Sequence, residues 1–182
     1  GALAVGATGG LINARALASL TPGSFTLIDA TNASSATITG FTLGVLTGGY
    51  SYALDNTTGG QLKLTVGSAA AGPYYWTGAR STTSWAALAS NGTTSNWATV
   101  SAAGTDAGAS PGNIDVNFTL GSAVSTTLDQ PYSLTGLTFA GSSAGNGNVT
   151  INAGSGDINS ILNIPLTKRS SLSEKSLVCF PC

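Results

Sequence analysis

Aspartates are the residues of this chain with the clearest potential for catalysis. Outside the C-terminal tail they occur singly, in turns and at the ends of apolar runs: Asp29, Asp55, Asp106, Asp115, Asp129 and Asp157. Acid–base catalysis needs two carboxylates, or a histidine, held close together. Asp115 and Asp129 would form such a pair if successive turns of the chain brought them to one face, as in an enzyme that acts on polysaccharides. Because Asp is a common turn residue and Arg80 is the only basic residue between 74 and 166, we expect the aspartates to be structural.

Nucleophilic and metal chemistry lack their usual residues. The chain has no histidine, which excludes a Ser–His–Asp triad, and Lys63 is the only lysine before the tail. Zinc would find only Cys179 and Cys182, and this Cys-x-x-Cys pair has no following helix that could lower a thiol pKa. Residues 154–157 (GSGD) match a calcium-binding repeat only once. We therefore expect no catalytic residue, no bound metal and no cofactor.

Four aromatic residues form the remaining candidate site. Tyr75, Trp76, Trp85 and Trp97 lie in one stretch that holds every tryptophan of the chain. An exposed row of such amphipathic rings binds sugars by stacking against their CH faces. Tryptophans also cover the open end of a stack of β-strands, where they are buried. The sequence leaves both interpretations open: carbohydrate contact by these four residues, or a core and capping role.

The composition predicts an exported protein with few ionic interactions. Charged residues make up 7% of the chain, against about 25% in an average soluble domain, and the net charge is −1. No basic stripe could neutralise a nucleic-acid backbone, and no apolar run reaches the roughly 18 residues of a membrane span. We expect no nucleic-acid partner, no membrane span, and a surface solvated by hydroxyl and amide groups.

Short runs of alternating apolar and polar residues predict strands, because side chains point alternately to the two faces of a strand. The clearest run is 114–120, and similar runs cover 24–29, 36–45, 61–66, 133–140 and 148–152. Residues 11–20 fit either a short helix or a strand. Runs that start near 114, 133 and 148 recur at roughly 15–20 residues, which suits short, solenoid-like coils of a parallel β-helix. A β-sandwich is the alternative, so the sequence predicts an all-β fold.

Composition divides the chain into two units and a tail. The units cover 1–70 and 74–166, and the small-residue stretch Ala69–Pro73 between them is expected to act as a flexible linker. The tail 167–182 differs in composition, since it holds Glu174, both cysteines and three of the six basic residues, and we expect it to be disordered. The start at Gly1 suggests an internal or processed part of a longer protein.

Residues 74–151 contain an ordered set of motifs. Tyr75-Trp76-Thr77-Gly78 comes first, and Asn96-Trp97 and Pro111-Gly112 follow; the set ends with the strand-like run 114–120 and with Leu134–Phe139 (LTGLTF). This order resembles the start of proteins with autotransporter-associated β-strand repeats, a family of bacterial surface proteins. The family's Gly-Asp before the strand is replaced here by Gly112-Asn113-Ile114-Asp115. The second unit is thus expected to start a repeat, with the tryptophans near its cap.

Residues 24–66 resemble the closing part of a preceding repeat in the same family, through SFTLID (24–29), Gly49-Tyr50 and LKLTV (62–66). The resemblance implies a large, repetitive, exported protein with a β-helical passenger and no catalytic residue. We therefore expect a non-catalytic structural or adhesive segment, secreted or on the bacterial cell surface at the outer membrane. Its expected partners are surface glycans or other copies of the same protein. A carbohydrate-binding module and a fragment of a β-helix polysaccharide-active enzyme remain as alternatives.

Overall fold

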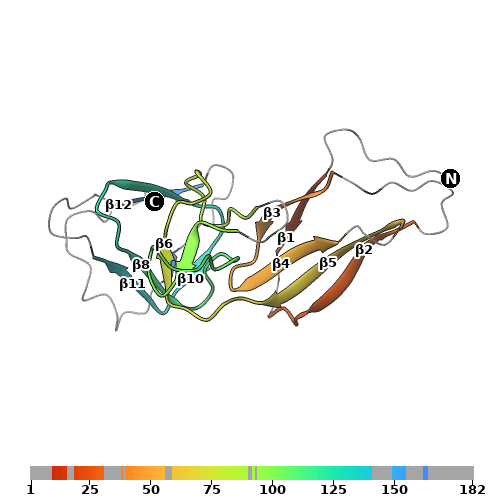
Figure 1. The fold of residues 1–182 in the computed structure, drawn as a ribbon, viewed down its shortest axis with the longest axis horizontal. Coiled ribbons are helices and arrows are strands. Elements are labelled where there is room, and N and C mark those ends of the chain that lie inside the picture. The colour runs from red at the N-terminus through yellow and green to blue at the C-terminus, as the bar shows by residue number, and fades with distance from the viewer. Residues whose placement is uncertain are drawn as a thin grey trace.

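The computed structural model of the chain describes residues 10–15, 19–30, 38, 40–55, 59–89, 92, 94–140, 149–154 and 162–163. Within these ranges every regular element is a β-strand, and the sheets are open rather than closed into a barrel. The prediction of an all-β protein is therefore confirmed. Figure 1 shows two neighbouring parts, an N-terminal part made by β1–β5 and a C-terminal part made by β6–β13.

Two sheets make up the N-terminal part. β1 (Leu11–Ala14) pairs in parallel with β3 (Thr42–Leu46). β5 (Gln61–Ser68) lies at the centre of an antiparallel sheet, between β2 (Gly23–Asp29) and β4 (Tyr50–Asp55). The strands of this antiparallel sheet are the longest of the described chain.

Alternation along β5 explains how the N-terminal part packs. Leu64 and Val66 point inward and are buried, whereas Thr65 between them is exposed. They belong to a buried group that we call the N-terminal cluster: Leu43, Leu46, Tyr52, Leu64, Val66 and Leu88. Leu88 comes from the C-terminal part of the chain, so this core crosses the boundary between the two parts.

Three parallel strand pairs form the body of the C-terminal part. The pairs are β8 (Asp115–Phe118) with β11 (Gly136–Phe139), β9 (Val124–Leu128) with β12 (Val149–Ala153), and β10 (Tyr132–Ser133) with β13 (Leu162–Asn163). The strands β8, β9 and β10 follow one another along the chain, and their partners β11, β12 and β13 follow in the same order. The register runs without a bulge from Val149 opposite Val124 to Ala153 opposite Leu128.

The sheet that contains β8 is closed at one end by an antiparallel strand. β8 also pairs in parallel with β6 (Tyr74–Trp76), and β6 pairs antiparallel with β7 (Trp97–Thr99), giving the order β11-β8-β6-β7. Residues 105–107 then cover the outer edge of β7: the Thr99 N–H donates to Thr105 O at 2.8 Å, and the Ala107 N–H donates to Trp97 O at 2.8 Å. The backbone groups of this edge strand are thereby paired.

Most of the predicted runs correspond to observed strands. The run 114–120 contains β8, and the runs 24–29, 61–66 and 148–152 overlap β2, β5 and β12 over most of their length. The run 133–140 is divided between β10 and β11, because the chain bends at Thr135. The described residues of 11–20 form strand β1 rather than a helix. The run 36–45 overlaps β3, although part of it lies outside the described residues, as does the tail 167–182.

Candidate functional site

Aromatic rings occupy the centre of the C-terminal core. Its buried residues, which we call the C-terminal cluster, are Tyr74, Trp76, Trp85, Trp97, Ala107, Ala109, Val116, Phe118, Leu128, Tyr132, Leu134 and Leu137. The ring of Trp97 meets those of Trp76 and Trp85 edge-on, with centroids 5.0 Å apart in both pairs. Phe118 stacks on Trp76 at 6.0 Å. Each such aromatic pair adds about 0.5–1.5 kcal/mol beyond its area burial, so these rings are a major source of stability.

Hydrogen bonds hold the loop that carries Trp85 against β7. The indole Nε1 of Trp97 donates to the Trp85 carbonyl at 2.9 Å. The buried side chain of Asn96 accepts from the Arg80 N–H at 2.7 Å and donates to the Ser84 carbonyl at 2.8 Å. Three polar backbone groups of an irregular loop are thus paired inside the protein, as burial requires. These hydrogen bonds hold Trp85 and Trp97 in the core.

The burial of the tryptophans corrects the interpretation that they form a sugar platform. Trp85 and Trp97 are 0% exposed and Trp76 is 3% exposed. A ring that is enclosed by other side chains has no face left to stack on a sugar. Among the four candidate residues only Tyr75, half-buried on β6, reaches the surface. The core and capping role, which the sequence also allowed, fits the burial of all three indoles.

Asp115 and Asp129, the candidate catalytic pair, have separate hydrogen-bond partners. Asp115, the first residue of β8, accepts from the Thr135 hydroxyl at 2.6 Å. Asp129, directly after β9, accepts from the Ser84 hydroxyl at 2.6 Å and from the Ala86 N–H at 3.1 Å. Each carboxylate therefore links two segments distant in sequence, as a structural aspartate does. Burial raises the pKa of Tyr74, which lies in the C-terminal cluster, to about 12.

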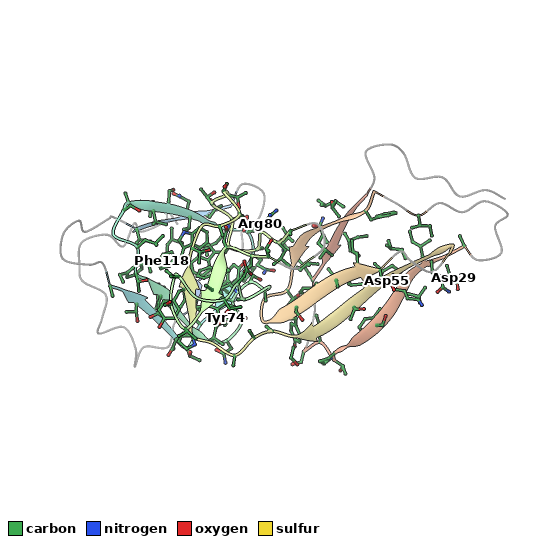
Figure 2. All side chains as sticks on the ribbon, in the orientation of Figure 1. Asp29, Asp55, Tyr74, Arg80 and Phe118 are labelled. Carbon is green, nitrogen blue, oxygen red and sulfur yellow. The ribbon has the colours of Figure 1, made fainter. Side chains whose placement is uncertain are left out.

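Two further aspartates of the described residues also accept hydrogen bonds from neighbouring groups. Asp106 accepts from the Ser95 N–H at 2.9 Å and from the Gly108 N–H at 2.7 Å, and Asp29 accepts from the Gln61 amide at 3.1 Å. Figure 2 shows Asp29 and Asp55 in the N-terminal part, away from Arg80. No three His, Cys, Asp or Glu side chains gather into a metal site within the described residues. Asp157, Cys179 and Cys182 lie outside them.

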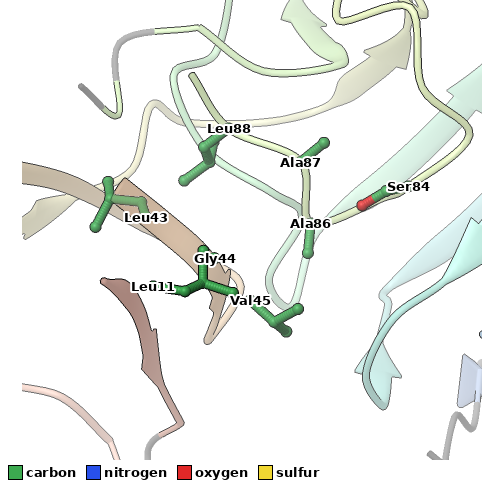
Figure 3. Close-up of a pocket in the computed structure, with 8 residues that line it drawn as sticks. All are labelled: Leu11, Leu43, Gly44, Val45, Ser84, Ala86, Ala87 and Leu88. Atoms are coloured by element: carbon green, nitrogen blue, oxygen red, sulfur yellow. The ribbon is translucent and has the colours of Figure 1, made fainter. Parts of the chain in front are cut away.

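An open pocket of about 250 Å³ lies between β1, β3 and the segment 84–88 (Figure 3). Its lining residues are Leu11, Leu43, Gly44, Val45, Ser84, Ala86, Ala87 and Leu88. They are apolar except for Ser84, whose hydroxyl donates to Asp129. Binding pockets usually combine an apolar wall with a few convergent polar groups, and this pocket lacks the second feature. It provides no group for proton transfer or for ion binding.

Gln130 is a buried polar residue that the sequence analysis did not single out. It is 5% exposed, and its amide donates to the Leu46 carbonyl of β3 at 2.7 Å. Its place in an ordinary turn-like stretch (Asp129-Gln130-Pro131) gave no signal of this contact, because the partner lies far away in the sequence. Gln130 therefore joins the two parts of the molecule.

Comparison of the chain with protein-family models, curated proteins and solved structures found no match in any of the three. Among the described residues no helix is long and apolar enough to cross a membrane.

Proposed function

We propose that this chain is a non-catalytic structural or adhesive segment of a secreted or cell-surface bacterial repeat protein. The observation that carries the proposal is the order of the parallel pairs, in which β8, β9 and β10 are followed by β11, β12 and β13, each beside its counterpart. A chain that repeats one path in register builds a stack that lengthens with every repeat. We interpret the two sets as successive coils of a parallel β-solenoid.

Side-chain contacts between the two sets of strands support this interpretation. On the apolar face, Phe118 and Phe139 stack with centroids 5.6 Å apart, at equivalent positions of β8 and β11. Outside, the Asn152 amide donates to the Ser125 hydroxyl and to the Thr126 carbonyl, both at 3.1 Å. Such contacts stiffen a stack by packing and neutral hydrogen bonds, which fits a chain with 7% charged residues.

The tryptophans of the C-terminal cluster, together with β7, serve as the cap of this stack. A solenoid exposes its apolar interior and unpaired backbone groups at its ends unless a cap covers them. Here β7 and residues 105–107 pair the edge beyond β6, and Trp76, Trp85 and Trp97 fill the space behind it. The cap gives the stack a direction, so that further coils would lie on the side of β11.

The proposal is tested by measuring whether the chain cleaves extracellular polysaccharides. The full chain is incubated with a panel of polysaccharides, and soluble sugar release is measured together with retention on immobilised glycans. We expect no sugar release, and the same result for Asp115→Asn and Asp129→Asn. Sugar release that either substitution abolishes would replace the scaffold by the enzyme alternative. Small-angle scattering should give an elongated particle, whereas a spherical one would contradict the stack.

A further inference from the structure

The connection between the two parts is packed rather than free. Residues 69–73 join β5 to β6, and the Tyr74 hydroxyl donates to the Ala70 carbonyl at 2.9 Å. Ala69 packs against the C-terminal cluster. A β-carbon added at Gly72 would lie 3.0 Å from the Ile114 side chain, so the backbone runs directly over that residue. The flexible linker predicted from the composition is therefore held at both ends by the C-terminal part.

Three glycines, Gly48, Gly49 and Gly112, let the backbones of the two parts come into direct contact. The Gly49 N–H donates to the Ser110 carbonyl at 3.0 Å. A β-carbon at Gly48 would overlap the Pro111 carbonyl, and one at Gly112 would lie 2.6 Å from Gly49 Cα. Gly49 also has a φ of 85°, which favours glycine. Only residues without a side chain permit this approach, and the sequence places them on both sides of it.

Side chains from the C-terminal part complete the N-terminal core. Leu88 is 8% exposed and belongs to the N-terminal cluster. Gly92 lies so close to Tyr52 that a β-carbon there would overlap the Tyr52 carbonyl. The Gln130 amide reaches the Leu46 carbonyl at 2.7 Å, and a buried carbonyl that loses its donor destabilises the fold. We call the contacts made by Leu88, Gly92 and Gln130, together with those of the three glycines described above, the interlock.

We infer that the interlock makes the two parts one cooperative unit, which unfolds and refolds as a whole. Gln130 is the residue that couples the two parts. A small N-terminal core that takes one of its leucines from the neighbouring part has less to gain by folding alone. The inference goes beyond the proposed function, because a glycan-binding or enzymatic protein with these contacts would show the same coupling.

The test uses a variant in one part and a probe in the other. All three tryptophans lie in the C-terminal part, so their fluorescence reports that part alone. Leu64→Ala creates a cavity in the N-terminal cluster. In the full chain we expect it to lower the urea midpoint of the tryptophan signal. Amide exchange, followed by mass spectrometry, should quicken at least about tenfold in peptides from both β5 and β8.

Quicker exchange in β5 alone, with an unchanged tryptophan midpoint, would overturn the inference. Leu64→Val, a milder truncation, gives the same comparison if Leu64→Ala does not fold. Gln130→Ala tests the coupling residue, with Asn96→Ala as the control, since Asn96 is a buried amide bonded within the C-terminal part. In Gln130→Ala we expect the amide-exchange rates of β5 and β8 to change by different factors. In Asn96→Ala we expect both rates to rise by the same factor. Coincident shifts in Gln130→Ala would refute the role of Gln130.

Discussion

The two parts of the molecule reach stability by different means. The N-terminal part has long antiparallel strands, of which β5 has eight residues, around a small cluster that is mainly aliphatic. The C-terminal part has strands of only two to five residues, such as β10 with two and β6 with three, around the larger C-terminal cluster, which is rich in aromatic residues. Large rings bury much area for each residue that is ordered. Short strands with irregular loops can therefore be held in place where tryptophans fill the interior.

The sheet edges differ in the same way. The edge of β7 is covered by residues 105–107. Strand β2, at the edge of the antiparallel sheet, is exposed over most of its length, with Phe25 45% and Leu27 42% exposed. A bulge between Thr26 and Ile28 interrupts its register, and bulges of this kind discourage an edge strand from pairing with another molecule. One part covers an edge, and the other distorts it.

Loss of a central tryptophan should have the largest effect, because the C-terminal part depends on buried rings. We expect Trp97→Ala to lower the free energy of unfolding by about 3–5 kcal/mol, measured by urea denaturation. Phe139→Ala is the control, since Phe139 stacks on Phe118 but is 37% exposed, and it should cost less than about 2 kcal/mol. Equal losses in the two variants would contradict the special role of the enclosed rings.

Truncation in the N-terminal cluster should cost less. Leu46 is 1% exposed, and Leu46→Ala should lower the free energy of unfolding by about 2–3 kcal/mol, the lower part of the range for leucine truncations, because the cluster is small. Leu27→Ala removes the same atoms from a 42% exposed side chain of β2, and it should change stability by less than about 0.5 kcal/mol. A larger loss for Leu46→Ala than for Trp97→Ala would reverse the comparison.

Alkaline pH should destabilise both parts through their tyrosines. Burial raises the pKa of Tyr52 in one part and of Tyr74 in the other to about 12, and it also raises the pKa of Tyr132. These phenols ionise near pH 10 in the unfolded chain but stay protonated in the folded one. The contribution of these tyrosines to stability is thus constant below about pH 10 and falls from about pH 10 to 12, by at most about 1.4 kcal/mol per pH unit for each tyrosine. Urea midpoints measured across this range should fall less steeply in Tyr132→Phe, and a pH-independent midpoint would contradict the burial of the phenols.

Relief of backbone strain next to β7 should produce the smallest effect. Val100 follows β7, is 81% exposed and has a φ of 71°, a conformation unfavourable for a β-branched residue. Val100→Gly should raise the free energy of unfolding by about 0.5–1 kcal/mol, because the relieved strain exceeds the extra entropy that glycine loses. Thr99→Gly, one residue earlier within β7, should instead lower the free energy of unfolding, because glycine weakens a strand. A lower melting temperature for Val100→Gly would contradict the prediction that the relieved strain exceeds the entropy that glycine loses.

Alternation predicted strands well where one face of a strand is buried. In β8, buried Val116 and Phe118 alternate with half-buried Asp115 and Asn117, as the pattern of 114–120 requires. The pattern failed to divide 133–140 into β10 and β11, because a strand that turns a corner keeps its apolar spacing. The aromatic residues stood out in the sequence, but whether a tryptophan lies inside or on the surface depends on what covers it, which residue type alone does not reveal.

By itself the sequence determined the class of the fold and the scarcity of reactive groups. Two-residue periodicity requires strands, and a chain without histidine and with 7% charged residues has few candidates for proton transfer. The tertiary structure alone decided which strands are neighbours, that the tryptophans are enclosed, and that Gln130 reaches Leu46. The reason is physical: periodicity is a property of neighbouring residues, whereas pairing, burial and hydrogen bonding between distant segments depend on how the whole chain closes on itself.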